Sequence, residues 1–311
     1  MPIGASAASS KPSSSGSMRA TTSRNRLTSR GSKASSRTGC RTSRRSRRRR
    51  TPPTPTRADP AAQGKGPPMS FEPFVIAAPA KVNLALHVLG RRDDGYHELD
   101  SIVAFADRGD SLRFTPATDF ELTADGAFAH QLPAAADNII ARAWQLGAAI
   151  AQARGLTVPG AAIHLTKALP VASGIGGGSA NAAATLRGLM KIAGLPPDDA
   201  EIRRAALSLG ADVPVCLFGR ACRMQGVGER IVALEAFRGR TALLVNPGVA
   251  VSTPAVFGRL GLKTGEGFGA PVAEAGDIGG WRNDLAPAAI ALSPVIGAAI
   301  AWLAAQPGVT H

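Results

Sequence analysis

The alternation of apolar and polar residues predicts that regular structure begins near residue 70. The segment "FVIAAPAKVNLALHVLG" alternates as a half-buried strand does, and we expect strand structure around Val82–Leu89. The polar stretch "RRDDGYHEL" then connects it to "DSIVAFADRGDSLRF", which predicts two strands separated by a turn at residues 108–110. A further strand is expected in "GAAIHLTKALP", ending at Pro170.

Three segments have the spacing and end signals of helices. In "DNIIARAWQLGAAIAQARG" one face is apolar, and we expect Asp137 to cap the helix and Gly155 to end it. A second helix is expected from Ser179 to Ala193, and "PPDDAEIRRAALSLG" predicts a third. Strands and helices in this order favour an α+β fold with a mostly antiparallel or mixed sheet.

A cluster of glycines lies between the strand that ends at Pro170 and the helix that follows. Glycine loses more conformational freedom on folding than other residues, so a cluster of four is costly unless bare backbone is needed. The first amides of a helix lack internal partners and carry partial positive charge, so such a loop can close around a phosphate. A tight structural turn is the alternative. The loop does not match a Walker A or a Rossmann fingerprint.

The same segment supplies the residues that we expect to contact a phosphate-bearing ligand. Lys167 would add a charge, and Ser179 would cap the helix and offer a hydroxyl to phosphate or magnesium. The full expected set is Lys167, Pro170, Val171, Ala172, Ser173, Gly174, Ile175, Gly176, Gly177, Gly178, Ser179 and Ala180.

Two charged residues lie in otherwise apolar surroundings. Lys81 is in the first strand and Asp212 is in "ADVPVCLF", and because a buried unpaired charge is costly we expect them to pair. Phosphoryl transfer to a hydroxyl needs an oriented oxygen, a proton acceptor and a nearby cation, which this pair supplies. A purely structural salt bridge is the alternative. Asn83 lies on the same face of the strand as Lys81 because side chains alternate.

The polar connection after the first strand contains a candidate ligand contact. Tyr96 is the sole tyrosine of the chain and precedes His97. An aromatic face that stacks and an imidazole that forms hydrogen bonds suit a nucleobase. A packing role for this loop is the alternative.

Positive charge is concentrated at the N-terminal end. The formal net charge is +14, but residues 1–68 contain 16 of the 36 Lys and Arg residues and one of the 22 acids, so the remainder is almost neutral. This Ser- and Arg-rich segment has too few apolar residues for a core, and we expect it to be disordered. It has three interpretations: an Arg tract at residues 44–50 that binds phosphates or directs localisation, an organelle transit peptide, or translated sequence upstream of a start at Met69. The abrupt change in composition favours the last.

The remaining composition restricts the setting of the protein. No apolar run reaches the roughly 20 residues of a membrane helix, so no membrane partner is expected. The three cysteines lack zinc-site spacing, and so sparse a count favours a reducing compartment. We therefore expect a cytoplasmic protein, or a plastid protein if residues 1–68 are a transit peptide. Nucleic acid is expected only as a non-specific partner of that segment.

The glycine loop resembles the second motif of the GHMP kinases, the family of galactokinase, homoserine kinase and mevalonate kinase. "PAKVNLALHVLGRRDDGYHEL", "GADVPVCLFGRACRMQGVGE" and "NDLAP" resemble motifs of one member in the same order. The resemblance covers about residues 71–311 and is specific as a set. It implies a two-domain fold, with an ATP-binding domain at residues 69–235 and a partial C-terminal domain at residues 236–311. The family's third motif, a Gly-Ser-Gly-Ala loop, is not found before "AAQPGVTH", so we expect a truncated C-terminal domain.

The resemblance also implies a reaction. It is ATP-dependent phosphorylation, with Mg²⁺, of the 2-hydroxyl of a cytidyl-diphosphate-linked methylerythritol in the non-mevalonate route to isoprenoid precursors. Lys81 and Asp212 match catalytic positions, with Asp212 expected to accept the proton. Asn83, Tyr96 and His97 are expected at the substrate, the last two at its cytosine. A homoserine or mevalonate kinase-like substrate, or nucleic acid binding through the basic tail, are alternatives. No metal ligand is identified.

Overall fold

The computed structural model describes residues 70–134, 137–235, 237, 239–273 and 280–309. The chain divides into two compact units, residues 1–63 and 64–311, and all described residues belong to the second. The predictions for residues 1–68 therefore lie outside the described residues. The boundary expected between residues 235 and 236 stays a prediction.

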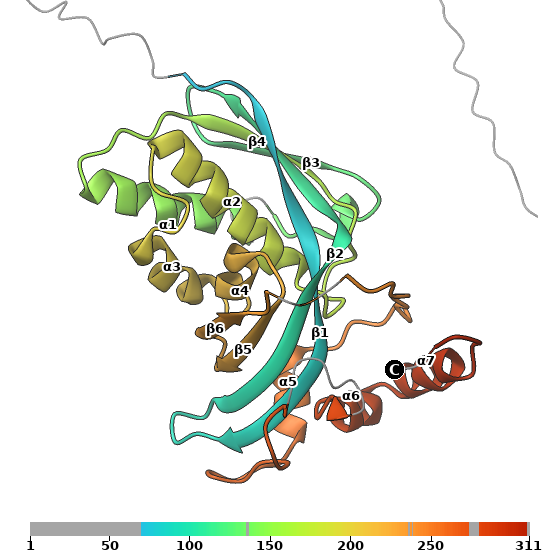
Figure 1. The fold of residues 1–311 in the computed structure, drawn as a ribbon. Coiled ribbons are helices and arrows are strands. Elements are labelled where there is room, and N and C mark those ends of the chain that lie inside the picture. Colours follow the sequence, from blue (N-terminus) through green and yellow to red (C-terminus); the bar gives the residue numbers. More distant parts are fainter. Residues whose placement is uncertain (1–69, 135–136, 236, 238, 274–279, 310–311) are drawn as a thin grey trace, which may run out of the picture. The chain divides into compact units, whose positions relative to one another are not determined.

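Two long antiparallel strands, β1 and β2, run through a six-stranded sheet within the described residues, and β2 is its central strand (Figure 1). One edge of β2 pairs with β1, while its other edge pairs with β4 at one end and β5 at the other. β3 joins β4 in parallel and β6 joins β5 in antiparallel fashion, so the sheet is mixed, as expected from the sequence. The strands are β1 (Phe74–Arg91), β2 (His97–Pro116), β3 (Glu121–Asp125), β4 (Ala161–Thr166), β5 (Cys222–Gly226) and β6 (Arg230–Ala233).

The turn expected at residues 108–110 is wrong, because β2 continues through them. Gly109 lies opposite Pro79, where the pairing of β1 and β2 shifts in register. A Cβ atom on Gly109 would lie 2.3 Å from the carbonyl oxygen of Ala78. The glycine therefore permits a close approach of two strands at an irregularity in the ladder and does not reverse the chain.

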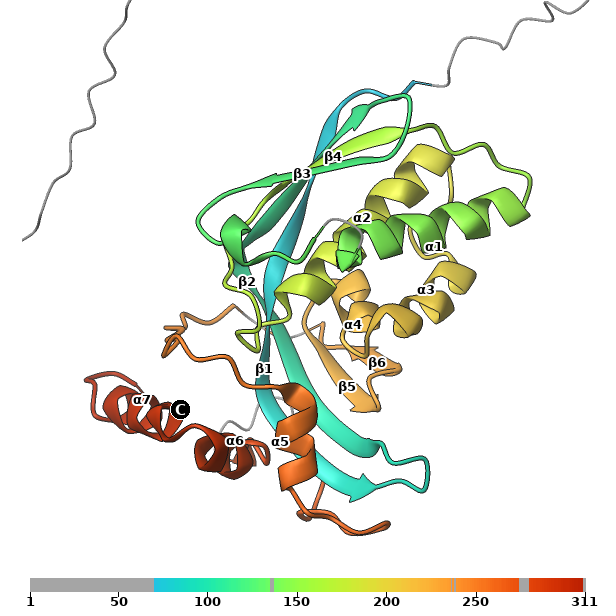
Figure 2. The same ribbon diagram turned by 180° about the vertical axis from the view of Figure 1, so that it is seen from behind.

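Helices α1–α4 lie to one side of the long β1–β2 hairpin in both views (Figures 1 and 2). The main core forms where α2 packs on the sheet and α1 packs on α2. Leu112, Phe114 and Ile163 of the sheet are buried in this core, and so is the predicted apolar face of α1. The helices are α1 (Ile139–Ala153), α2 (Gly177–Ala193), α3 (Ala200–Ala206), α4 (Val213–Phe218), α5 (Thr253–Arg259), α6 (Ala286–Leu292) and α7 (Pro294–Ala304), with short 3₁₀ turns at Ala129–Gln131 and Leu207–Leu209.

Two helix caps differ from those expected. The Asn138 side chain, not that of Asp137, accepts the Ile140 N–H at 2.9 Å and caps α1. Ser179 does not cap α2, because the helix already begins at Gly177, after Gly176 in the left-handed conformation with φ 67°. Glycine adopts this conformation without steric conflict from a side chain, so α2 begins two residues before Ser179.

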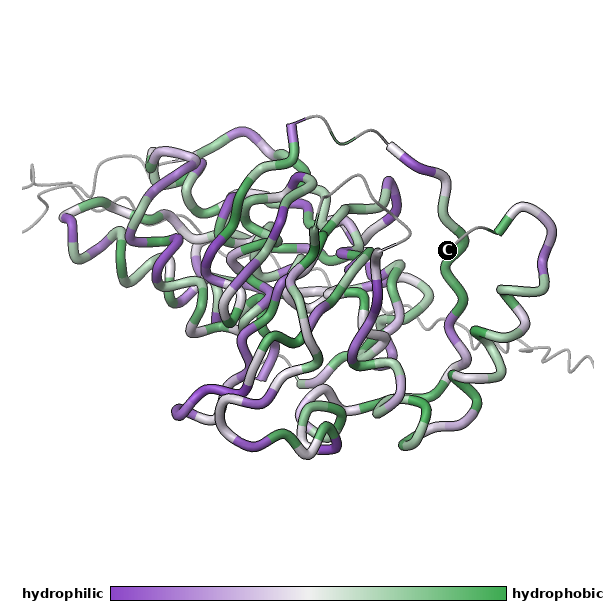
Figure 3. The backbone as a smooth tube through the Cα atoms, turned by 60° about the horizontal axis from the view of Figure 1, so that its bottom comes forward, coloured by the Kyte–Doolittle hydropathy of each residue, from purple (hydrophilic) through white to green (hydrophobic). Residues whose placement is uncertain are grey.

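The free edge of β1 is covered by backbone from the C-terminal part of the chain. Leu86 exchanges hydrogen bonds with Arg282 and Asp284, and the Phe268 N–H donates to the carbonyl of Val88. The helical segment that leads to the marked C-terminus is largely hydrophobic (Figure 3), and Trp302 on α7 is exposed. No helix among the described residues is long and apolar enough to cross a membrane.

Candidate active site

Lys81 and Asp212 form the ion pair that the sequence predicts. The Lys81 Nζ on β1 donates to Asp212 Oδ1 at 2.7 Å, although the residues are 131 positions apart. The Lys81 side chain is 4% exposed and that of Asp212 is 38% exposed. The cation is therefore shielded, while the carboxylate remains accessible to a ligand.

Asp212 is held by the short helix α4. It immediately precedes this helix, and its carbonyl accepts the Cys216 N–H at 3.1 Å. At the other end of α4, the guanidinium of Arg187 on α2 donates to the carbonyls of Cys216 and Leu217. Burial lowers the pKa of Arg187, which nevertheless stays charged and complements the helix C-terminus. Both ends of α4 are thus fixed.

The glycine loop lies directly against Lys81. The carbonyl of Ile175 accepts the Lys81 N–H at 2.9 Å, and a Cβ atom on Gly176 would lie 3.1 Å from the Cβ of Lys81. The first amides of α2 have no acceptor within the helix, so they can bind an anion at the end of this loop. The structure therefore brings the expected phosphate loop and the Lys81–Asp212 pair to one place.

Lys167 is buried next to the start of α2, where a Cβ atom on Gly177 would lie 3.4 Å from its Nζ. Its Nζ donates to Asp110 Oδ2 at 2.7 Å, with the two side chains 2% and 0% exposed. The expectation that Lys167 lends its charge to a bound phosphate therefore stays a prediction. Its ammonium is already paired, and leaving Asp110 would strand a buried carboxylate.

Ser179 lies in the first turn of α2, where its half-buried hydroxyl remains a candidate ligand. The earlier loop residues line a separate hollow of about 460 Å³ that also includes Phe128 and Gln131. The side-chain oxygen of Gln131 accepts the Val171 N–H at 3.0 Å and thereby holds the start of the loop. The loop residues in this hollow are Pro170, Val171 and Ala172.

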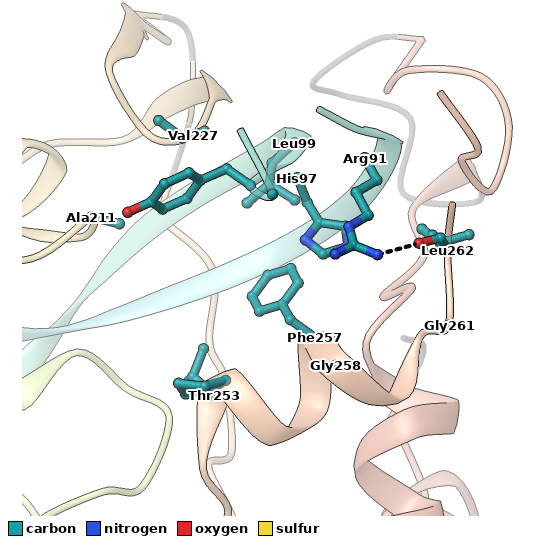
Figure 4. Close-up of a pocket in the computed structure, with 13 residues that line it drawn as sticks. Arg91, His97, Leu99, Ala211, Val227, Thr253, Phe257, Gly258, Gly261 and Leu262 are labelled. Atoms are coloured by element: carbon teal, nitrogen blue, oxygen red, sulfur yellow. Dashed lines mark hydrogen bonds between the residues drawn. The ribbon is translucent and has the colours of Figure 1, made fainter. Parts of the chain in front are cut away.

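Tyr96 and His97 line a cavity of about 660 Å³ at the turn between β1 and β2. The His97 and Phe257 rings lie next to each other, with their planes inclined by 31° and their centroids 5.0 Å apart (Figure 4). Burial, assisted by the charge of Arg91, lowers the pKa of His97 and so favours the neutral imidazole. Tyr96 is 63% exposed and leaves its ring available for stacking.

Several residues of this cavity were not predicted from the sequence. Phe257 and Thr253 come from α5, and Arg91 donates to the carbonyl of Leu262 at 2.8 Å on the cavity wall (Figure 4). The available signal was "STPAVF", a Ser-Thr-Pro helix start with an aromatic residue, but nothing local relates it to Tyr96.

The Tyr96 cavity and the Lys81–Asp212 ion pair lie next to each other, because two consecutive residues belong one to each. Ala211 lines the cavity, and the next residue is Asp212. Asn83 lies two residues beyond Lys81 on β1, and its amide nitrogen donates to Ser101 Oγ at 2.7 Å. A ligand seated against Tyr96 can therefore extend towards the carboxylate of Asp212, whereas the NH₂ group of Asn83 is already engaged.

Comparison with known proteins agrees with this arrangement. Residues 138–220, from the cap of α1 to the end of α4, match the GHMP kinases N terminal domain. The match contains the glycine loop and Asp212, so this part of the chain is that of a protein of the GHMP kinase class.

Two relatives are each 50% identical to the chain and are named 4-diphosphocytidyl-2-C-methyl-D-erythritol kinase. The one from Paramagnetospirillum magneticum aligns over 238 residues, 75% of this chain and 82% of the relative. The one from Ruegeria pomeroyi aligns over 235 residues, 73% of this chain and 79% of the relative. A crystal structure of 4-(cytidine 5'-diphospho)-2C-methyl-D-erythritol kinase matches with a TM-score of 0.58 and 30% identity, covering 75% of this chain and 83% of that one. The chain belongs to the 4-diphosphocytidyl-2-C-methyl-D-erythritol kinase family.

Proposed function

We propose that this protein transfers the γ-phosphate of ATP to the 2-hydroxyl of 4-diphosphocytidyl-2-C-methyl-D-erythritol. The observation that carries the proposal is the Lys81–Asp212 pair, which has the glycine loop on one side and the Tyr96 cavity on the other. A kinase needs these three parts next to each other, because its chemistry depends on positioning and charge stabilisation. The cytoplasmic setting stays a prediction.

In this mechanism Asp212 is the general base. Its accessible carboxylate accepts the proton of the substrate hydroxyl as the oxygen attacks the γ-phosphorus. Lys81 holds Asp212 through the 2.7 Å hydrogen bond and adds positive charge next to the reacting oxygens. The amides at the start of α2 bind the nucleotide phosphates and need no reorganisation during transfer.

Mg²⁺ is proposed as the ion that accompanies ATP and neutralises its phosphate oxygens when bound. Magnesium prefers oxygen ligands and commonly uses one or two protein oxygens together with substrate phosphates. The chain offers the Ser179 hydroxyl in the first turn of α2. No group of three or more His, Cys, Asp or Glu side chains arranged for a metal occurs within the described residues.

The cavity supports a cytidyl substrate over homoserine or mevalonate. Tyr96, His97 and Phe257 present aromatic surfaces and a neutral imidazole, which suit stacking and hydrogen bonding to a pyrimidine. A small aliphatic acid would leave these surfaces unused. The alternative of nucleic acid binding through the basic tail concerns residues outside the described part of the chain.

The test is phosphate transfer by the purified chain, followed by ³¹P NMR, with the cytidyl substrate, homoserine and mevalonate offered separately. Product from the cytidyl substrate alone is expected. The variant Asp212→Asn should lose about 10³-fold in kcat, within the range for a lost general base. A matched variant, Asp199→Asn, removes a carboxylate paired with Arg154 and should retain full kcat.

Full activity of Asp212→Asn would remove this residue from the role of base. Product from homoserine or mevalonate instead would identify a different GHMP substrate. A chain that starts at Met69 should retain the activity if residues 1–68 are dispensable, whereas activity lost with that segment would give the basic tail a part in function.

A further inference from the structure

A buried ion pair behind the glycine loop has no part in the mechanism above. Lys167 follows β4 directly and Asp110 lies within β2, and their side chains meet at 2.7 Å with almost no exposure to solvent. Two charges buried in this way are retained only when their geometry is good and their remaining hydrogen-bonding groups are satisfied. The burial of this pair therefore depends on the further hydrogen bonds that its two side chains make.

The second oxygen of Asp110 binds the entry of the loop. Asp110 Oδ1 accepts the backbone N–H groups of Ala168 and Leu169, both at 2.8 Å. These residues immediately precede Pro170, the first residue of the loop. Because β2 is the central strand of the sheet, this carboxylate connects the loop entry to the most extensively paired element of the fold.

The cation of the pair lies beneath the exit of the loop. A Cβ atom on Gly177 would be 3.4 Å from the Nζ of Lys167, so the ammonium lies next to the first residue of α2. The backbone of Lys167 is also fixed on both sides, because its N–H donates to the backbone carbonyl of Asp125 and its own carbonyl accepts the Phe128 N–H. The Lys167–Asp110 pair thus contacts the loop at both ends, through Asp110 at its start and through Lys167 at Gly177.

We propose that Lys167 and Asp110 are positioning residues, which set the distance between the loop entry and the first turn of α2 without touching the nucleotide. The nucleotide part of this inference rests on the proposed function. A phosphate is bound well only when several backbone amides already point at one place, so a fixed loop lowers the ordering cost of binding. Loss of either partner should therefore weaken ATP binding and leave the Tyr96 cavity unaffected.

The test compares Asp110→Asn, Lys167→Met and the double variant with the natural chain. Each single variant should raise the KM for ATP about tenfold or more and change the KM of the second substrate less than twofold. The direction of the change in the KM for ATP of Asp110→Asn decides between two explanations. If Lys167 contacted the phosphate directly, release of its ammonium from Asp110 would tighten ATP binding and lower this KM. A lower KM for ATP in this variant would overturn the proposal.

The matched control is Asp199→Asn. Asp199 is also a buried carboxylate that accepts from a cation, Arg154, and from two backbone N–H groups, but it caps α3 and does not contact the loop. It should lower the melting temperature with no change in the KM for ATP. An equal rise in that KM would show that any buried carboxylate pair has the same effect, and would reject a specific positioning role.

Hydrogen–deuterium exchange tests the same idea without nucleotide. The amides of Ala168, Leu169 and Ala180 should exchange at least tenfold faster in the variants, while amides of α1 keep their rates. If a single variant does not fold, the double variant carries the test, because it leaves no unpaired buried charge. Unchanged loop exchange in a folded double variant would overturn the positioning role. Failure of the natural chain to bind ATP would count against the proposed function alone.

Discussion

Truncation of Tyr96 to alanine should separate the binding of the two substrates. The Tyr96 ring lines the cavity at the β1–β2 turn but is 63% exposed, so its removal opens no void in the core. A change in the free energy of unfolding of at most about 0.5 kcal/mol is expected, as for other surface substitutions. Any larger effect on binding then comes from the lost contact with the ligand.

The size of that effect follows from stacking. An aromatic ring that stacks on a nucleobase contributes roughly 1–3 kcal/mol by alanine substitution. Because Tyr96 is open to solvent, the lower half of this range applies, and about 1–2 kcal/mol corresponds to a 5- to 30-fold rise in the KM of the cytidyl substrate. The KM for ATP should be unchanged, since the glycine loop shares no residue with this cavity.

Steady-state kinetics with each substrate varied in turn provides the measurement. Phe268→Ala is a matched control, because Phe268 is also an exposed aromatic residue but does not line the cavity. It should leave both KM values unchanged. An equal rise in the two KM values of Tyr96→Ala, or a rise in that for ATP alone, would refute the assignment of this cavity to the cytidyl group.

Three further predictions concern pH and packing. Burial lowers the pKa of His97, so the KM of the cytidyl substrate should begin to rise only at a pH below that at which an unperturbed imidazole titrates; a rise that begins at higher pH would contradict a lowered pKa. A Cβ atom on Gly188 would lie 2.3 Å from the Phe114 ring, and urea unfolding of Gly188→Ala should show a loss of about 1–3 kcal/mol, whereas an unchanged midpoint would contradict tight packing there. Hydrogen bonds from Arg154 hold the pKa of Asp199 at about 2, below the unfolded value, so the stability they provide is present at neutral pH and lost as pH falls from about 4 to about 2. Asp199→Ala should remove about 1–2 kcal/mol at pH 7 and flatten this part of the acid unfolding curve.

The Lys81–Asp212 pair was predictable from the sequence, because each charge lies in an apolar segment and needs a partner of opposite sign. No such constraint identified the partner of Lys167. A lysine just before a glycine loop looks like a phosphate ligand, and Asp110 was assigned to a turn. Since a glycine permits either a turn or a close approach of two strands, the sequence around Gly109 could not distinguish the two. Because the prediction of a turn at residues 108–110 was wrong, the sequence did not identify Asp110 as the partner of Lys167.

The cavity was only half predictable for a related reason. Tyr96 and His97 are adjacent and their chemistry suggests a nucleobase, but Phe257 lies about 160 residues further along the chain. Its place next to His97 depends on the C-terminal backbone that pairs with β1. Such long-range pairing leaves no local periodicity in the sequence, and only the family resemblance indicated that this part of the chain belongs to the same enzyme.

The strand β1 explains why the three parts of the site occur together. At Lys81 its backbone binds the glycine loop through Ile175, and its side chain binds Asp212. Ten residues further along, Arg91 reaches the cavity wall at Leu262. The glycine loop, Asp212 and the Tyr96 cavity are thus all attached to one strand, which pairs with β2 along one edge and makes isolated bridges along the other. The glycine loop and the cavity contact this strand ten residues apart, at Lys81 and Arg91, and share no residue. The binding of each substrate therefore depends chiefly on its own contacts, which is the physical basis for expecting separate effects on the two KM values.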